Sequence, residues 1–115
     1  MIINPVNDEW LTSVLSALGG TPGEVAATLR AAGFSGGRGS GVRCPVALYV
    51  RAKAKERVPS ASRVFVWSGS DAVSVRIARE DGEVLVRVTP PLAVSAFIEA
   101  FDSGGDYADL DDAGT

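Results

Sequence analysis

The sequence predicts a single α+β domain in which helices pack on a three-stranded antiparallel β-meander. Apolar residues recur with helical spacing as far as Val58, they alternate with a period of two between residues 63 and 88, and turn sequences separate the alternating runs. A chain of 115 residues is long enough for one hydrophobic core. We therefore expect one domain over residues 1–101, with an N-terminal helical hairpin, a basic helix, the meander and a C-terminal helix, followed by a mobile acidic tail over residues 102–115.

Two capping sequences predict the N-terminal helical hairpin. Asn7 precedes a helical turn that begins with two acidic residues, and the glycines at 19–20 end the apolar stripe that follows. Thr21–Glu24 then places a cap, a proline at the first helical position and a glutamate at the third, which is the order of a capping box. Gly33 suits the left-handed residue that commonly ends a helix.

The glycine-rich stretch over residues 35–42 predicts a loop before the third helix. It lacks the Gly-Lys-Ser/Thr sequence with which a phosphate-binding P-loop enters its helix, and a helix precedes it where a P-loop needs a strand. A connector is therefore the favoured interpretation, with loose anion contact by Arg38 and Arg43 as the alternative. Pro45 marks the start of the basic helix, which we expect to continue until Pro59.

Three short alternating runs predict the meander. They begin at Arg63, Val73 and Val84, and the sequences between them are rich in Ser, Gly, Asp and Glu, as turns are. The prolines at 90–91 end the sheet, and a final helix follows that ends near Phe101. This order of helices followed by sequential strands is typical of α+β domains.

Charge is sorted along the chain. Eight of the eleven basic residues fall between Arg30 and Arg63, whereas ten of the fourteen acids fall between Asp71 and Asp112. Clustered cations attract acidic partners and polyanions, and an acidic tail competes for the same cations. The cations that we expect to contact a partner are Arg38, Arg43, Arg51, Lys53, Lys55, Arg57 and Arg63.

These charges favour a non-catalytic binding or regulatory module that engages a protein partner through its basic helix and loop. The acidic tail would mask that surface, anchored by Tyr107 and Leu110. Nucleic-acid binding is the alternative, because two helices, a basic third helix and a hairpin follow the order of a winged-helix module. Tyr49, Phe65 and Trp67 fit core positions and base-stacking positions equally well. Pairing of an edge strand leaves a homodimer open.

Cys44 is the candidate reactive thiol, because a helix N-terminus and the adjacent Arg43 both favour a thiolate. The other interpretation is a small buried residue next to Pro45. The chain contains no histidine, so the usual Cys-His and Ser-His-Asp arrangements are excluded, and a small enzyme using Cys44 is the second alternative. No cofactor is implied. No metal site is expected either, because the tail aspartates lack the spacing of a calcium loop; they are Asp106, Asp109, Asp111 and Asp112.

The sequence shows no basic leader followed by a long apolar run, so we expect a cytoplasmic location without membrane contact. Two segments, Val25–Gly36 and Cys44–Val50, together resemble small proteins of GC-rich actinobacteria that share the pattern LRaxGxxG followed by CPxAxYL. From the first of these residues to the last, the resemblance spans a little under a quarter of the chain. It implies an accessory or regulatory role and transfers no activity, cofactor or site residue.

Overall fold

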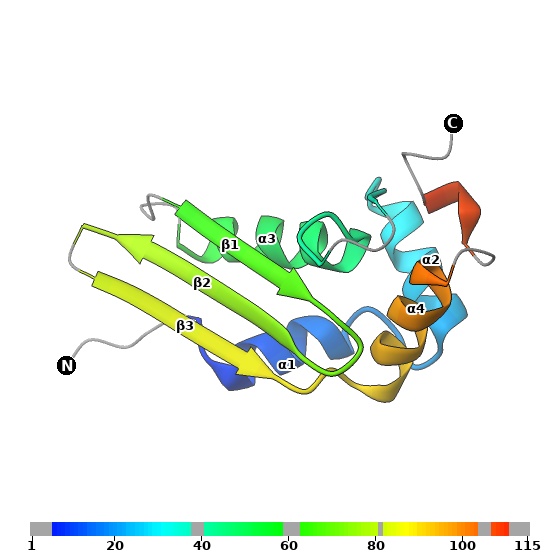
Figure 1. Ribbon diagram of the computed structural model, residues 1–115, viewed down its shortest axis with the longest axis horizontal. Helices are drawn as coiled ribbons and strands as arrows, with labels where there is room; N and C mark the ends of the chain where they lie inside the picture. The colour runs from blue at the N-terminus through cyan, green and yellow to red at the C-terminus, as the bar shows by residue number, and fades with distance from the viewer. Residues whose placement is uncertain (1–5, 38–40, 59–62, 81, 104–106, 111–115) are drawn as a thin grey trace.

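The chain folds into a three-stranded sheet backed by helices, with a further group of helices at one end (Figure 1). This computed structural model describes residues 6–37, 41–58, 63–80, 82–103 and 107–110. The elements are the helices α1 (Asp8–Ser16), α2 (Pro22–Ala31), α3 (Pro45–Arg57) and α4 (Leu92–Asp102), the strands β1 (Arg63–Ser68), β2 (Val73–Arg79) and β3 (Gly82–Val88), and the 3-10 helix η1 (Ala108–Leu110). The predicted α+β class is confirmed. None of the helices in these ranges combines the length and apolarity needed to cross a bilayer.

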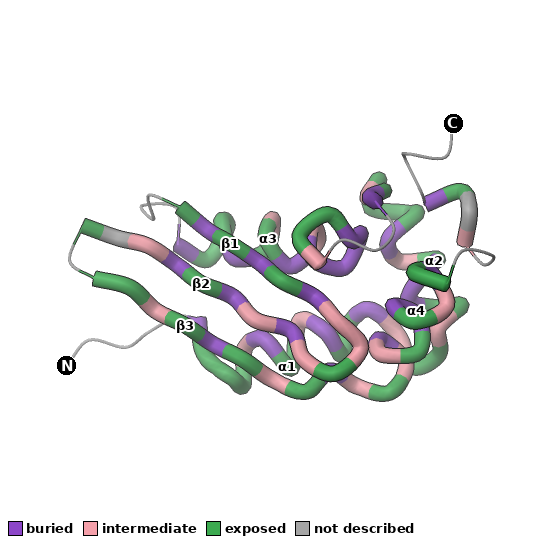
Figure 2. The backbone as a smooth tube through the Cα atoms, viewed as in Figure 1, coloured by how far each residue is buried: buried purple, intermediate pink, exposed green. Residues whose placement is uncertain are grey.

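The strands form an antiparallel meander in the order β1-β2-β3, so β1 and β3 are its edges. Buried and exposed residues alternate along β1 (Figure 2), because successive side chains of a strand point to opposite faces. The inner face carries buried residues such as Val66, Val75 and Val86. It packs against α3 beneath β1 and against α1 beneath β3.

Helix boundaries follow the predicted caps. The side chain of Asn7 accepts a backbone N–H hydrogen bond of 2.8 Å at the start of α1. At the start of α2, Thr21 Oγ1 accepts from the amide of Glu24 at 3.1 Å, and Glu24 Oε1 accepts from the amide of Gly20 at 2.8 Å. The glutamate thus reaches one residue further back than in the usual capping box. Gly33 has a φ of +81°, the left-handed conformation expected at the helix end.

The first two helices share α3 as a neighbour but differ in their main partners. α1 lies against β3 and α3, whereas α2 lies mainly against α4 at the end of the sheet and also contacts α3. The turn between them is tight. Gly19 has a φ of +147°, and a Cβ placed there would lie 2.6 Å from the Cβ of Glu24. Any other residue would strain this turn.

The described part of the acidic tail packs on α2 and α4. Leu110 is buried in the core, and the ring centroid of Tyr107 lies 5.0 Å from that of Phe97 on α4. Asp109 forms an ion pair with Arg30 of α2, which includes a second hydrogen bond of 3.1 Å. These contacts of residues 107–110 are with α2 and α4, and masking of α3 by the tail stays a prediction. The other tail aspartates considered as cation ligands, Asp106, Asp111 and Asp112, lie outside the described residues.

Candidate binding surface

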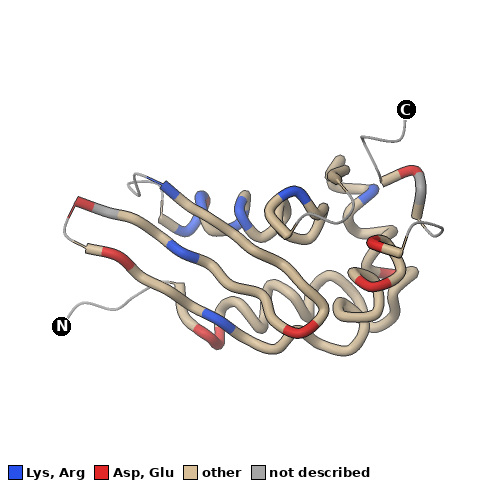
Figure 3. The backbone as a smooth tube through the Cα atoms, viewed as in Figure 1, with Lys and Arg blue, Asp and Glu red and all other residues tan. Residues whose placement is uncertain are grey.

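Four of the predicted contact cations lie along α3 (Figure 3), and helical spacing divides them between two sides of the helix. Arg51 and Lys55 lie one turn apart and line the same groove. Lys53 lies on the other side, where its ammonium is 3.7 Å from a carboxylate oxygen of Glu56 and 5.5 Å from the ring centroid of Tyr49. Arg38 falls outside the described residues, and the exposed remainder of the set is Arg43, Arg57 and Arg63.

Cys44, the candidate reactive thiol, is only 1% exposed. Burial raises the pKa of the Cys44 thiol, and a hydrogen bond with Ser68 opposes that rise only in part. A raised pKa leaves less thiolate at neutral pH, which is opposite to what a nucleophilic cysteine needs. These facts favour the interpretation of Cys44 as a packed residue at the start of α3.

The described end of the glycine-rich segment lies against β1. The carbonyl of Gly41 accepts the backbone N–H of Ser68 at 2.8 Å. A Cβ on Gly41 would lie 2.5 Å from Cε2 and 2.7 Å from Cδ2 of Trp67. The indole ring therefore packs directly on the backbone of residue 41, which is possible only because glycine has no side chain. Gly41 therefore extends the edge of the sheet and supports Trp67.

The outer face of the sheet is covered by none of the described elements, since the helices lie behind the sheet or at its end (Figures 1 and 2). The strand register sets its nine positions in three rows across β1, β2 and β3. The rows are Arg63, Ala78 and Glu83; Phe65, Arg76 and Leu85; and Trp67, Ser74 and Arg87. We call these nine residues the open face.

Three large apolar side chains stand on the open face. Phe65 is 47% exposed, Trp67 59% and Leu85 69%. In the described part of the chain only two other large apolar residues, Val42 and Leu92, are comparably exposed. Single exposed apolar residues are ordinary, but a cluster of them marks an interaction surface.

The arginines of the open face give it positive charge. The guanidinium of Arg76 lies 5.9 Å from the ring centroid of Phe65 and also pairs with Glu83 on β3. Arg76 is therefore held between an aromatic ring and a carboxylate. With Arg63 and Arg87, the face carries three arginines against one glutamate. Backbone pairing fixes the spacing of these groups.

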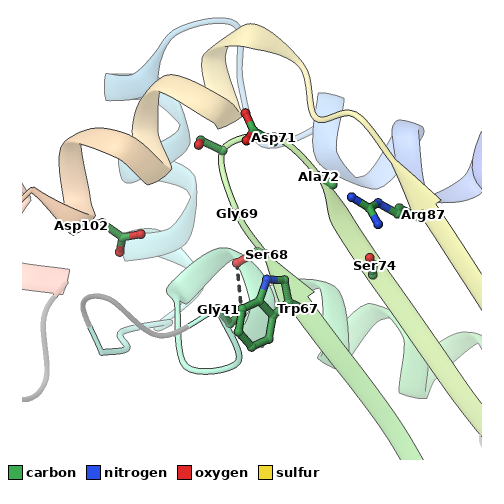
Figure 4. Close-up of a pocket in the computed structure, with 10 residues that line it drawn as sticks. Gly41, Trp67, Ser68, Gly69, Asp71, Ala72, Ser74, Arg87 and Asp102 are labelled. Atoms are coloured by element: carbon green, nitrogen blue, oxygen red, sulfur yellow. Dashed lines mark hydrogen bonds between the residues drawn. The ribbon is translucent and has the colours of Figure 1, made fainter.

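One end of the open face is hollowed into a pocket of about 470 Å³ (Figure 4). Trp67, Ser74 and Arg87 line it from the strands, Asp71 lines it from the β1–β2 turn, and Asp102 lines it from the end of α4. This volume lies within the range of about 300–1,000 Å³ typical of ligand pockets. The pocket therefore offers both signs of charge beside an aromatic ring.

The predicted contact residues include Arg63 but not Arg76, Leu85 and Arg87. The sequence does contain a pattern that points to these three residues. Polar residues at alternate positions of β2 and β3 mark the outer face, and the period of two then assigns Leu85 to the same side as Arg87. The β1 run is apolar or aromatic at four consecutive positions, so its own pattern did not show which face is exposed.

Comparison with protein-family models, curated proteins and solved structures gives no match. We therefore infer the function from the geometry of the open face.

Proposed function

We propose that this chain is a non-catalytic binding module that contacts an acidic protein partner through the open face of its sheet. The observation that carries the proposal is the cluster of Phe65, Trp67 and Leu85 among arginines on a face that no described element covers. Aromatic residues and arginine are enriched in protein interfaces, and Trp and Arg also among the residues that contribute most to binding. The excess of arginine on the face favours a partner with matching acidic groups.

A protein partner fits this surface better than a nucleic acid. Leu85 stands in the middle row of the open face and offers no ring on which a base stacks. The carboxylates of Asp71 and Glu83 lie at its ends and repel a continuous run of phosphates, whereas a protein can present acidic groups to the arginines alone. A winged-helix mode needs one basic face on α3, but Arg51 and Lys53 lie on different sides.

The proposal is tested by placing the photo-crosslinking residue p-benzoylphenylalanine at Leu85 and, as a matched control, at Leu92. Both leucines are exposed, but Leu92 starts α4 and lies outside the open face. In extract of the source cells, position 85 is expected to form one dominant protein adduct. Position 92 is expected to form no such adduct. In a chain that carries the crosslinker at position 85, the substitution Arg87→Glu should reduce the yield of the adduct at least tenfold.

Two results would contradict the proposal. Equal adduct yields at the two positions would show that the open face has no special affinity. An adduct at position 85 that nuclease removes would identify a nucleic acid as the partner.

A further inference from the structure

Building on the proposed function, we propose that the partner supplies an extended acidic segment that pairs with β1 as a fourth strand of the sheet. The open face would then contact the body of the partner, while the segment occupies the free edge beside it. In strand addition of this kind, backbone hydrogen bonds supply affinity, and pockets for alternate side chains supply specificity.

The backbone of β1 is oriented for such pairing. At the hairpin, Gly69 donates to the carbonyl of Ala72 at 2.9 Å, and the antiparallel alternation then points the amides at 64, 66 and 68 away from β2. Ser68 confirms this orientation, because its amide donates outward to Gly41. Among the described residues, the outward amides of Val64 and Val66 have no hydrogen-bond partner. The described residues thus fill one position of this edge, at Ser68, and occupy neither of the other two.

A groove of about 200 Å³ runs beside the open positions. It is lined by the three consecutive residues Val64–Val66, by Ala47 and Arg51 of α3, and by Val42. Successive strand side chains point to opposite faces, so a cavity that touches three in a row lies along the strand edge. Val42 is 51% exposed there. An added strand would cover it.

Charge argues for an acidic occupant and against a second copy of this chain. Arg51 lines the groove, Lys55 follows one turn later on α3, and Arg63 begins β1. Two copies paired through β1 would bring these cations together, which is unfavourable because like charges across a ladder repel. A segment with alternating acidic and apolar residues can turn its acidic side chains toward Arg51 and Lys55 on the α3 side of the edge, and its apolar side chains toward the open face beside Phe65.

The test is amide hydrogen exchange followed by NMR on the full chain. The probe is an end-blocked decapeptide of alternating Glu and Val; its controls are a peptide with Lys in place of Glu and one N-methylated at alternate residues. In the free protein, the amides of Val64 and Val66 should exchange rapidly, while the amide of Phe65 is protected by pairing with Arg76. The Glu-Val peptide should slow Val64 and Val66 at least tenfold, and neither control should. Arg51→Glu should weaken binding of the Glu-Val peptide at least tenfold.

The outcomes separate this inference from the proposed function. Peptide binding that perturbs Trp67 and Leu85 without protecting Val64 and Val66 would overturn strand addition and leave the open face as the contact surface. Failure of the Glu-Val peptide to bind would also overturn it. Protection that grows with protein concentration in the absence of peptide would identify a second copy as the occupant. Loss of the contrast between positions 85 and 92 in crosslinking would instead remove the proposed function.

Discussion

At the scale of single residues, Gly41 links the glycine-rich segment to the candidate surface. The segment was interpreted from its composition as a connector, and composition alone holds no information on a contact with Trp67, which lies 26 residues further along the chain. The contact is steric: the indole occupies the space that a Cβ of residue 41 would need. It also orients Trp67, which otherwise stands 59% exposed on an edge strand.

Gly41→Ala is expected to destabilise the protein by about 1–3 kcal/mol, because Trp67 must move to admit the new methyl group. Urea unfolding measures the change. Gly23→Ala is the matched control: this glycine is exposed in the first turn of α2, and the nearest contact of a Cβ there is Thr21 Oγ1 at 3.9 Å. That variant should gain about 0.4–1 kcal/mol. Equal effects of the two substitutions would contradict the steric account.

Cys44 gives the protein a pH dependence of known sign. Because the pKa of the thiol is raised in the folded state, its contribution to stability is fully present below the unfolded pKa of about 8.5. That contribution is lost as the pH rises from there through the folded pKa. Urea unfolding at pH 7 and pH 9.5 should therefore show a larger loss of stability at high pH for the native chain than for Cys44→Ala. An identical loss in both proteins would show that Cys44 is not the titrating group.

Among the helices and strands, the sequence predicts the ones whose ends are marked by neighbouring residues, such as helix caps and turns. Asn7 and Thr21 cap the helices they were expected to cap, and the three strands begin within two residues of their predicted starts. The packing of one element on another was harder to predict from the sequence. The apolar stripe of α1 does not specify whether β3 or α2 covers it, and that choice depends on the whole core. The acidic composition of the tail likewise concealed the burial of Leu110.

Residues 107–110 form an element that contributes to the core. Leu110→Ala should lower the free energy of unfolding by about 2–5 kcal/mol, because Leu110 is 2% exposed. Leu92→Ala, at a residue that is 89% exposed, should change it by no more than about 0.5 kcal/mol. Urea unfolding compares the two, and a near-neutral Leu110→Ala would show that this segment is not packed. A truncation that tests masking by the tail should therefore end the chain after Leu110, because an earlier cut would remove a core residue.

At the scale of the whole molecule, the two faces of the sheet serve different purposes in this account. The inner face, with α1 and α3, holds the fold together, whereas the open face keeps large apolar side chains and arginines in water. Exposed apolar groups add little to folding and favour aggregation, so their clustering is best explained by a partner. The separation of acids and bases along the sequence is only partly a spatial one: Figure 3 shows cations along α3 and acids on α4, but further acids lie at the β2–β3 end of the sheet and on α1.

If the open face is apolar for binding rather than for folding, a Phe65→Thr/Leu85→Thr variant should keep nearly all of its free energy of unfolding. Threonine keeps the preference for strand structure, so the change reports burial and, at Phe65, loss of the contact with Arg76. In urea unfolding we expect a loss of no more than about 1 kcal/mol per site, beside about 2–5 kcal/mol for Ile77→Ala on the inner face. A loss at Phe65 and Leu85 as large as that of Ile77→Ala would show that the face is covered in the folded protein and is not open to a partner.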